Sequence, residues 1–230
     1  MATSKPTRAD GQATRQQILK AAGSLFAQKG FDATTSKEIC KKARVNIAAV
    51  NYHFDGKLAL YKEVLIHAHN QLIELNALID IQKQAICAQE KLNLVIDSLT
   101  KSALASPWQT KIFIREMLFP STHFAAIMQE VIHREITPKL AIIRDIVSQI
   151  IHLPPEHPAV SRCIFNIAAP NMIMLSVKHN ILNSVFNNLV PEHSSGHAQL
   201  TRHLQHAARL ALTADFSALY ANHDDAPTDK

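Results

Sequence analysis

The sequence predicts an all-α protein, in which an N-terminal three-helix helix-turn-helix domain is followed by a larger helical domain. Two observations support this fold class. Glycine is scarce, at 5 of 230 residues, only 6% of the residues are aromatic, and the apolar 47% is rich in Ala, Leu and Ile, which favours helices over sheets. Apolar residues also recur at spacings of three and four, and no segment alternates in the manner of a strand.

The first helix is expected from about Thr14 to Gln28, after a polar stretch, residues 1–12, that we expect to be disordered. Its apolar residues follow the i, i+4, i+7, i+8 spacing of one helical stripe. They are Ile18, Ala22, Leu25 and Phe26. Gly30 can adopt the left-handed conformation that ends such a helix.

The next two helices are short and carry their own start signals. Thr35 and Glu38 form a T-x-x-E capping box, which predicts a helix over about 36–43. Asn46 is a second N-cap candidate and predicts a third helix over about 47–54. Two short helices joined by a tight turn form a helix-turn-helix motif, here at about 35–54. In this motif the second helix enters the major groove of DNA.

The end of the third helix is marked by Asp55-Gly56, where we also expect Asp55 to cap the following helix. Helical spacing assigns Ile39, Ala43, Val50 and Phe54 to a small core, and Val45, in the turn, is expected to fill the gap between the helices.

The rest of the chain predicts further helices separated by proline and polar signals. One helix should run from Gly56 past Ile79, because apolar spacing is continuous over that range. The others are expected over about 91–105, from Ser106-Pro107, from Pro120 to Leu153 with a bend at Pro138, over 159–189 with an interruption at Pro170, and over 198–220. We therefore expect two domains, at 12–72 and 73–221.

The positive charge of the chain is concentrated at its N-terminus. Residues 1–60 hold ten Lys or Arg against four Asp or Glu, whereas residues 61–230 hold fourteen against fifteen. Basic residues that neutralise phosphates release counterions, which drives binding to DNA of any sequence. A solvated basic face would give the same charge count, but its coincidence with a helix-turn-helix pattern favours DNA as the partner.

The candidate DNA-binding residues are those that the helical period leaves outside the small core. Asn51 has the amide needed for bidentate pairing with adenine, and Ile47 can meet a thymine methyl group. Small side chains such as Ala48 allow close approach, while hydroxyl, imidazole and ammonium groups can reach phosphates. The full set is Thr35, Asn46, Ile47, Ala48, Asn51, Tyr52, His53 and Lys57. The alternative is that these are ordinary surface residues.

The segment from Thr14 to Tyr61 resembles the DNA-binding domain of the TetR family of bacterial transcriptional regulators. The similarity is carried by TRQQILKAAGSLFAQKGFDATT, EICKKARVNIAAVNYHF and DGKLALY, which cover about a fifth of the chain. Many members have a tyrosine at the position of Asn51 and a glycine at the position of Ala48. The NIAAVNYHF variant is similar to a subgroup that includes the CecR-type regulators, and SRCIFNIAAPNMIM is loosely similar to the C-terminal domain of that subgroup.

This resemblance implies an all-helical homodimer with a ligand-binding and dimerisation domain after the DNA-binding domain. It implies phosphate contacts for Thr35, Tyr52 and Lys57, and a dimer interface made by the last two long helices. It also implies a pocket among the middle helices for a small-molecule effector of unknown identity. Candidate pocket residues are Trp108, Phe113, Met117, Phe124 and Met128. A stripe of this kind is more often simply core, and the terminal helices can likewise cover the protein's own core.

Other features exclude several classes of protein. No run of about 18 apolar residues predicts a membrane span, and the polar N-terminus lacks the apolar core of a signal peptide, so we expect a cytoplasmic protein. The three cysteines, Cys40, Cys87 and Cys163, are expected to be reduced and mostly buried. The His193/His197 and His203/His206 pairs lack a supporting Cys or Glu cluster, so we expect neither a metal site nor a cofactor.

The sequence therefore predicts a ligand-responsive repressor that binds a palindromic operator as a homodimer and is released by an effector. An alternative is a DNA-binding dimer without an effector. An enzyme is a weaker alternative, because the chain contains no G-x-S-x-G, no glycine-rich phosphate loop and no H-E-x-x-H motif.

Overall fold

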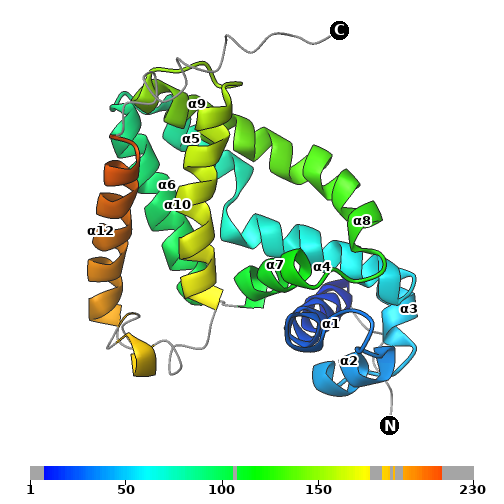
Figure 1. Ribbon diagram of the computed structural model, residues 1–230. Helices are drawn as coiled ribbons and strands as arrows, with labels where there is room; N and C mark the ends of the chain where they lie inside the picture. Colours follow the sequence, from blue (N-terminus) through cyan, green and yellow to red (C-terminus); the bar gives the residue numbers. More distant parts are fainter. Residues whose placement is uncertain (1–7, 106–107, 177–182, 187–188, 190–193, 214–230) are drawn as a thin grey trace, which may run out of the picture. The chain divides into compact units, whose positions relative to one another are not determined.

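The computed structural model describes residues 8–105, 108–176, 183–186, 189 and 194–213 (Figure 1). Within these ranges the backbone forms helices and turns and contains no strand, which confirms the predicted all-α fold class. The predicted helix restart at Ser106-Pro107 lies outside the described residues, as do parts of the predicted helices over 159–189 and 198–220.

The helices form two compact units. The first unit holds α1–α4, α7, α8 and the π-helical turn η1, and the second holds α5, most of α6, α9, α10 and α12. The bounds in the first unit are α1 Arg8–Lys29, α2 Ser36–Ala43, α3 Ala49–Phe54, α4 Lys57–Leu72, α7 Trp108–Leu118, α8 Phe124–Val131 and η1 Ile132–Ile136. Those in the second are α5 Leu75–Lys83, α6 Ala88–Ala105, α9 Thr137–Ile151, α10 Pro158–Ser176 and α12 Ser194–Ala211. This division by packing differs from the predicted domains, 12–72 and 73–221, which remain a prediction.

The core of the first unit forms where α1 packs against α2, α4 and α7. Its predicted members on α1, Ile18, Ala22, Leu25 and Phe26, are all buried. Three aromatic rings join α1 to α4, because Phe31 lies 5.8 Å from Phe26 and 4.7 Å from Tyr61 between ring centroids. α1 and α4 are therefore joined by a packed apolar and aromatic core.

The start of α1 differs from the prediction. The helix begins at Arg8 and not at Thr14, so residues 8–12 are helical and the prediction of disorder there was wrong. The Thr14 hydroxyl donates to the Asp10 carbonyl oxygen, 2.8 Å away, which places Thr14 inside the helix. Asp10 in the first turn also interacts favourably with the helix dipole.

The predicted continuous helix from Gly56 past Ile79 was also wrong. α4 ends at Leu72, Ile73 is extended with φ −155° and ψ 127°, and α5 begins at Leu75. No glycine or proline marks this break, and the apolar spacing continues across it. Ile73 is buried, so packing overrides the local pattern at this position.

The two helical prolines behave differently. Just before Pro138, where a bend is predicted, the chain forms the π-helical turn η1, and the Thr137 N–H donates to the Ile132 carbonyl five residues earlier. α10 continues through Pro170 to Ser176, so the predicted interruption there was wrong. The Asn171 amide donates to the Ile167 carbonyl oxygen at 2.7 Å, next to the position where the proline lacks an N–H.

The second unit buries one face of α12. Leu200, Leu204, Ala208 and Leu212 are buried, and the Gln205 amide donates to the Asn93 carbonyl of α6 at 3.0 Å. Of the three cysteines, Cys40 and Cys163 are buried and Cys87 is exposed, and all three are free thiols. Burial raises the pKa of the Cys163 thiol.

Candidate nucleic-acid interface

The predicted capping box is present at the start of α2. The Thr35 hydroxyl accepts from the Glu38 N–H at 3.2 Å, and the Glu38 carboxylate accepts from the Thr35 N–H at 3.0 Å. Lys29, at the end of α1, forms an ion pair with the same carboxylate. Chiefly because of Lys29, and then of the Thr35 N–H, the pKa of Glu38 is lowered from 4.5 to about 2. The start of α2 is therefore tied to the end of α1.

The turn between α2 and α3 is held by backbone hydrogen bonds. Arg44 is left-handed, with φ 56° and ψ 41°, and its N–H donates to the last carbonyls of α2, while the Val45 N–H reaches the Cys40 carbonyl at 3.0 Å. This pair of bonds is a Schellman cap. Asn46 follows, and its side-chain oxygen accepts from the Ala48 N–H at 2.9 Å.

The second helix of the motif is shorter at its start than predicted. α3 begins at Ala49, not at Ile47, because residues 47 and 48 form a turn in front of it. The Asn46 side chain caps that turn, as expected of an N-cap residue, although the residue directly before α3 is Ala48, which makes no side-chain cap. The element boundary therefore moves, while the role of Asn46 in holding the turn is retained.

The face of α3 that the helical period assigned to DNA is open to solvent. Val50 and Phe54 are buried below it, as predicted. Tyr52 is 84% exposed and Ile47 is 61% exposed. Of the eight predicted contact residues, Thr35, Asn46, Ile47, Ala48, Asn51 and Tyr52 are exposed and His53 and Lys57 are partly buried. In Figure 1, α2 and α3 lie next to each other beside α1 and the start of α4.

Lys57 has a structural role that the sequence did not indicate. Its ammonium donates to the carbonyl oxygens of Phe31 at 3.0 Å and Thr34 at 2.8 Å, and it lies 4.0 Å from the centroid of the Phe31 ring. These bonds tie the first turn of α4 to the α1–α2 loop. Two of the three ammonium protons are used in this way, and a phosphate contact by Lys57 remains a prediction.

The junction between α3 and α4 differs from the prediction in one detail. Asp55 ends α3 in the left-handed conformation, with φ 58°, and does not cap α4. The N-cap of α4 is Gly56, with φ 105°, a conformation that favours glycine. Asp55 and Gly56 thus stop one helix and start the next without a side-chain cap.

Three basic residues of this surface were missed by the sequence reasoning. Lys37, Lys41 and Arg44 are all exposed. Lys37 and Lys41 lie four residues apart on one face of α2, and Arg44 follows in the left-handed position that ends the helix. The basic residues are visible in the sequence, but their lack of a described partner is not. By contrast, the neighbouring Lys42 donates to the Ser24 hydroxyl at 2.7 Å.

Comparisons with known proteins agree with this geometry. Residues 18–64 match the family model for bacterial regulatory proteins of the tetR family. Residues 88–214, more than half of the chain, match the model for the C-terminal domain of the HTH-type transcriptional dual regulator CecR. The chain belongs to the TetR family. Its members are transcriptional regulators that bind DNA, and they are not enzymes. The predicted similarity to the CecR-type subgroup is confirmed as well.

Among curated relatives, the probable HTH-type transcriptional regulator YttP of Bacillus subtilis is 31% identical over 125 residues, 53% of this chain and 59% of that protein. The HTH-type transcriptional regulator AcrR of Shigella flexneri is 37% identical over 71 residues, 31% of this chain and 33% of that protein. The chain thus spans less than two thirds of the length of these relatives.

Solved structures support the TetR-family fold over most of the chain. The fatty acid degradation regulator FadR from Bacillus halodurans has a TM-score of 0.63 at 14% identity and covers 87% of this chain and 95% of its own. FadR from Bacillus subtilis, solved in complex with stearoyl-CoA, has a TM-score of 0.62 at 16% identity and covers 85% of this chain and 98% of its own. In the part of the chain that is described, no helix is long and apolar enough to cross a membrane.

The five candidate effector-pocket residues of this TetR-family chain lie on α7 and α8 in different surroundings. Phe113 is buried, Trp108, Phe124 and Met128 are partly buried, and Met117 is 64% exposed. Trp108 stacks on His67, with ring centroids 6.3 Å apart, and lies against Gly23 of α1. Its role in packing α7 onto α1 and α4 is therefore clear, whereas an effector contact remains a prediction.

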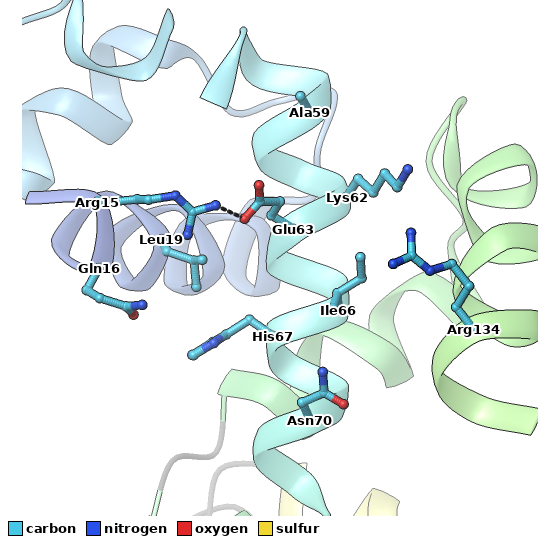
Figure 2. A pocket seen from close by; sticks show the side chains of 10 residues that line it. All are labelled: Arg15, Gln16, Leu19, Ala59, Lys62, Glu63, Ile66, His67, Asn70 and Arg134. Atoms are coloured by element: carbon cyan, nitrogen blue, oxygen red, sulfur yellow. Dashed lines mark hydrogen bonds and ion pairs between the residues drawn. The ribbon is translucent and has the colours of Figure 1, made fainter. Parts of the chain in front are cut away.

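A cavity of about 500 Å³ opens elsewhere in the same unit, between α1, α4 and η1 (Figure 2). None of the five candidate residues lines it. Its cations already have partners, because Arg15 is paired with Glu63, and Lys62 and Arg134 share the carboxylate of Glu130. The cavity therefore offers no unpaired charge for a ligand.

The described histidines do not form a metal centre. Among the described residues, no group of three or more His, Cys, Asp or Glu side chains is placed to hold a metal ion. His203 and His206 are exposed on α12, where the His206 ring nitrogen lies 3.0 Å from the Arg209 guanidinium. His193 lies outside the described residues.

His67 has a lowered pKa, first because of burial and then because of the nearby Lys20 and Arg15 charges.

Proposed function

We propose that this TetR-family regulator is a cytoplasmic repressor that binds a palindromic operator as a homodimer and is released by a small-molecule effector. The observation that carries the DNA-binding part is the solvent-exposed face of α3 above the buried Val50 and Phe54. In a helix-turn-helix protein the second helix of the motif enters the major groove. A polar and aromatic surface on that helix, next to a basic segment, fits such a role.

On the operator, base reading falls to Asn51 and Ile47, and phosphate binding to Thr35, Tyr52 and His53. Asn51 can pair with an adenine, and Ile47 can contact a thymine methyl group. Asn46 and Ala48 lie at the start of the same surface, where the chain can approach the DNA closely. Thr35 also presents the backbone N–H groups at the start of α2 to a phosphate.

A mobility-shift titration with the DNA upstream of the protein's own gene tests this surface. Tyr52→Ala and Asn51→Ala should each reduce affinity at least tenfold, because one phosphate or one bidentate base contact is lost. Phe119→Ala removes another exposed aromatic side chain, 70% exposed against 84% for Tyr52, outside α2 and α3, and serves as the control. The interface is wrong if both α3 variants bind like the control. Lys57→Ala is unsuitable here, because it also breaks two hydrogen bonds within the protein.

The dimer interface is assigned to α10 and α12. α10 exposes Phe165 at 61% and Ile173 at 51%, whereas α12 uses its apolar face in its own unit and exposes Leu210. Exposed large apolar side chains on one helix are typical of an interface between subunits. Phe165→Glu should convert a dimer to a monomer in light scattering, and Leu118→Glu, which also introduces a charge at an exposed leucine, should not. A monomeric wild-type protein would contradict the assignment.

Release by an effector requires two states of the dimer. The two recognition helices must lie about 34–36 Å apart to enter successive major grooves. An effector releases the operator only if it binds the DNA-incompetent state more tightly. α4 connects the recognition segment to the rest of the first unit and is the natural element to transmit that change.

Trp108 offers a direct assay for the effector. It is the only tryptophan in the chain and stacks on His67 of α4. Stearoyl-CoA, the compound bound to FadR from Bacillus subtilis, is the first one to test. If the predicted pocket around Phe113, Phe124 and Met128 binds it, saturable quenching of Trp108 should accompany release of DNA. Release of DNA without quenching would indicate that the effector binds away from α7.

A DNA-binding dimer without an effector is the second candidate. Two observations favour it: the five candidate pocket residues do not line the cavity between α1, α4 and η1, and the cations of that cavity are paired. Operator binding that resists a broad panel of acyl-CoA and drug-like compounds would support this candidate over ligand-responsive repression.

A further inference from the structure

Three exposed cations on α2 and at its C-terminal cap have no side-chain partner among the residues that the structure describes. Lys37, Lys41 and Arg44 are exposed, and none of them forms a side-chain hydrogen bond or ion pair with a described residue. Other basic residues nearby are engaged, since Lys29 pairs with Glu38 and Lys42 donates to Ser24. We call Lys37, Lys41 and Arg44 the α2 basic row.

Arg44 has a backbone conformation that non-glycine residues disfavour. Its φ of 56° and ψ of 41° lie in the left-handed region, and it stands in the Schellman cap at the position where glycine is favoured. The cap itself needs only the backbone of Arg44, because its bonds come from the N–H groups of Arg44 and Val45. Glycine would make the same bonds without strain. Non-glycine residues held in this conformation concentrate at functional sites, which suggests a function for the Arg44 side chain.

Lys37 is also placed against a local preference. It lies in the first turn of α2, directly before Glu38, where the partial positive charge of the helix N-terminus disfavours a cation. Two members of the row therefore weaken the local structure slightly, and neither side chain offsets that loss by a hydrogen bond or ion pair with a described residue. A partner outside the protein, carrying negative charge at the spacing of one helix face, accounts for both.

We propose that the α2 basic row binds the DNA phosphate backbone and sets the position of α3 in the major groove, with Arg44 as its main contact. The inference rests on the DNA-binding role proposed above. In helix-turn-helix complexes the first helix of the motif crosses the backbone while the second enters the groove. Arg44 stands in the turn that joins these two helices, and its guanidinium can bind a phosphate through two parallel hydrogen bonds.

Arg44→Gly separates this role from stability. Glycine relieves the left-handed strain, so the melting temperature should rise by about 2–4 °C. Binding to a mixed-sequence duplex about three helical turns long should nevertheless weaken, by about tenfold at 0.1 M salt. The slope of log K against log salt should become shallower by about 0.9 for each bound protomer. Lys37→Ala and Lys41→Ala should lower the slope in the same direction.

His152→Gly is the matched control. His152 is the described non-glycine residue of the second unit with a positive φ, also 56°, and it is exposed after α9. Its replacement by glycine should raise the melting temperature in the same way and leave DNA binding unchanged. Arg44→Lys keeps the charge and should retain most of the salt slope while losing part of the affinity.

The outcomes distinguish this inference from the proposed function. If Arg44→Gly binds the duplex with the affinity and salt slope of the wild type, the α2 basic row is not a phosphate site, and the DNA-binding role stands. If the wild type itself binds no duplex at low salt, the DNA-binding role and the inference both fail. If Arg44→Gly is stabilised and its salt slope is shallower while His152→Gly keeps the wild-type slope, the inference is supported.

Discussion

The helix-turn-helix segment and α7 belong to the same compact unit, yet they distribute polarity in opposite ways. In α2 and α3 the buried side chains, such as Ile39, Val50 and Phe54, are apolar. In α7 the buried set includes Gln109, Thr110 and Glu116. At the end of α7, large apolar side chains are exposed instead: Met117 at 64%, Leu118 at 66% and Phe119, just after the helix, at 70%.

The two regions also differ in how their polar groups are hydrogen-bonded. The polar groups at both ends of α2 are paired by the capping box and the Schellman cap. On α7, the buried Glu116 carboxylate accepts from the Ser121 N–H at 2.8 Å and lies beside the Tyr61 hydroxyl. The side-chain oxygens of Gln109 and Thr110 are buried, and no described residue hydrogen-bonds to them. Departures from local rules of this kind concentrate at sites kept for function.

α7 nevertheless holds the base of the DNA-binding segment in place. Arg115 donates to the Lys29 carbonyl at the end of α1 at 2.8 Å, and the Tyr61 hydroxyl lies 3.2 Å from the Ser121 hydroxyl just after α7. Burial, the largest cause, raises the pKa of Tyr61 far above its ordinary value, so the phenol stays protonated. The ends of α2 are closed by local hydrogen bonds, whereas the end of α7 is joined to α1 and α4 through the hydrogen bonds of Arg115 and Ser121.

The largest effect should follow from removing an apolar side chain in each region. Ile39→Ala, at a fully buried position, should lower the free energy of unfolding by about 2–5 kcal/mol, because it leaves a cavity. Leu118→Ala, at the exposed end of α7, should change it by less than about 0.5 kcal/mol. Denaturant unfolding measures both. Equal losses would mean that Leu118 is covered in solution, for example by a partner surface.

Crowding between α1 and α7 should have the next largest effect. A Cβ atom added at Gly23 would overlap the Trp108 ring, so Gly23→Ala should destabilise the protein by about 1–3 kcal/mol. Trp108→Leu should recover part of that loss in the double variant, which a double-mutant cycle measures. Strictly additive losses would indicate that the two residues are not in contact.

The helix cap of α2 should contribute less. Thr35→Ala removes the hydroxyl that accepts from the Glu38 N–H, and should cost about 0.5–2 kcal/mol of stability. Thr35→Ser keeps the cap and serves as the control for thermal unfolding. A loss of the same size in both variants would point to the methyl group of Thr35 and not to its hydroxyl.

The smallest effect should be on the stability of the protein in acid. The lowered pKa of Glu38 means that its carboxylate stabilises the folded state above about pH 4.5, and that this contribution is lost as the pH falls from 4.5 towards 2. Glu38→Gln lacks the contribution at every pH. The melting temperatures of wild type and variant should therefore differ at pH 6 and converge near pH 2, with a smaller difference in high salt, since the ion pair is exposed. A difference that persists at pH 2 would assign the effect to other causes.

The sequence alone determined the fold class, the helix-turn-helix position and the family. These features are local: a capping box at Thr35 needs only residues three apart, and the burial of Val50 and Phe54 follows from the helical period. The exposure of Asn51 and Tyr52 follows from the same period. Charge, spacing and turn residues therefore suffice to predict which side chains of the helix-turn-helix segment are exposed, whereas their contacts with DNA remain a prediction.

Only the tertiary structure decided which cations are free and where helices break. Lys57 looks like a surface lysine in sequence, but its ammonium is held by the Phe31 and Thr34 carbonyls. α4 stops at Leu72 although its apolar spacing continues, because burial of Ile73 in an extended conformation outweighs local helix propensity. Contacts between residues distant in the chain carry no local signal. They decided the roles of Lys57 and Trp108, and they left the α2 basic row without a side-chain partner among the residues that the structure describes.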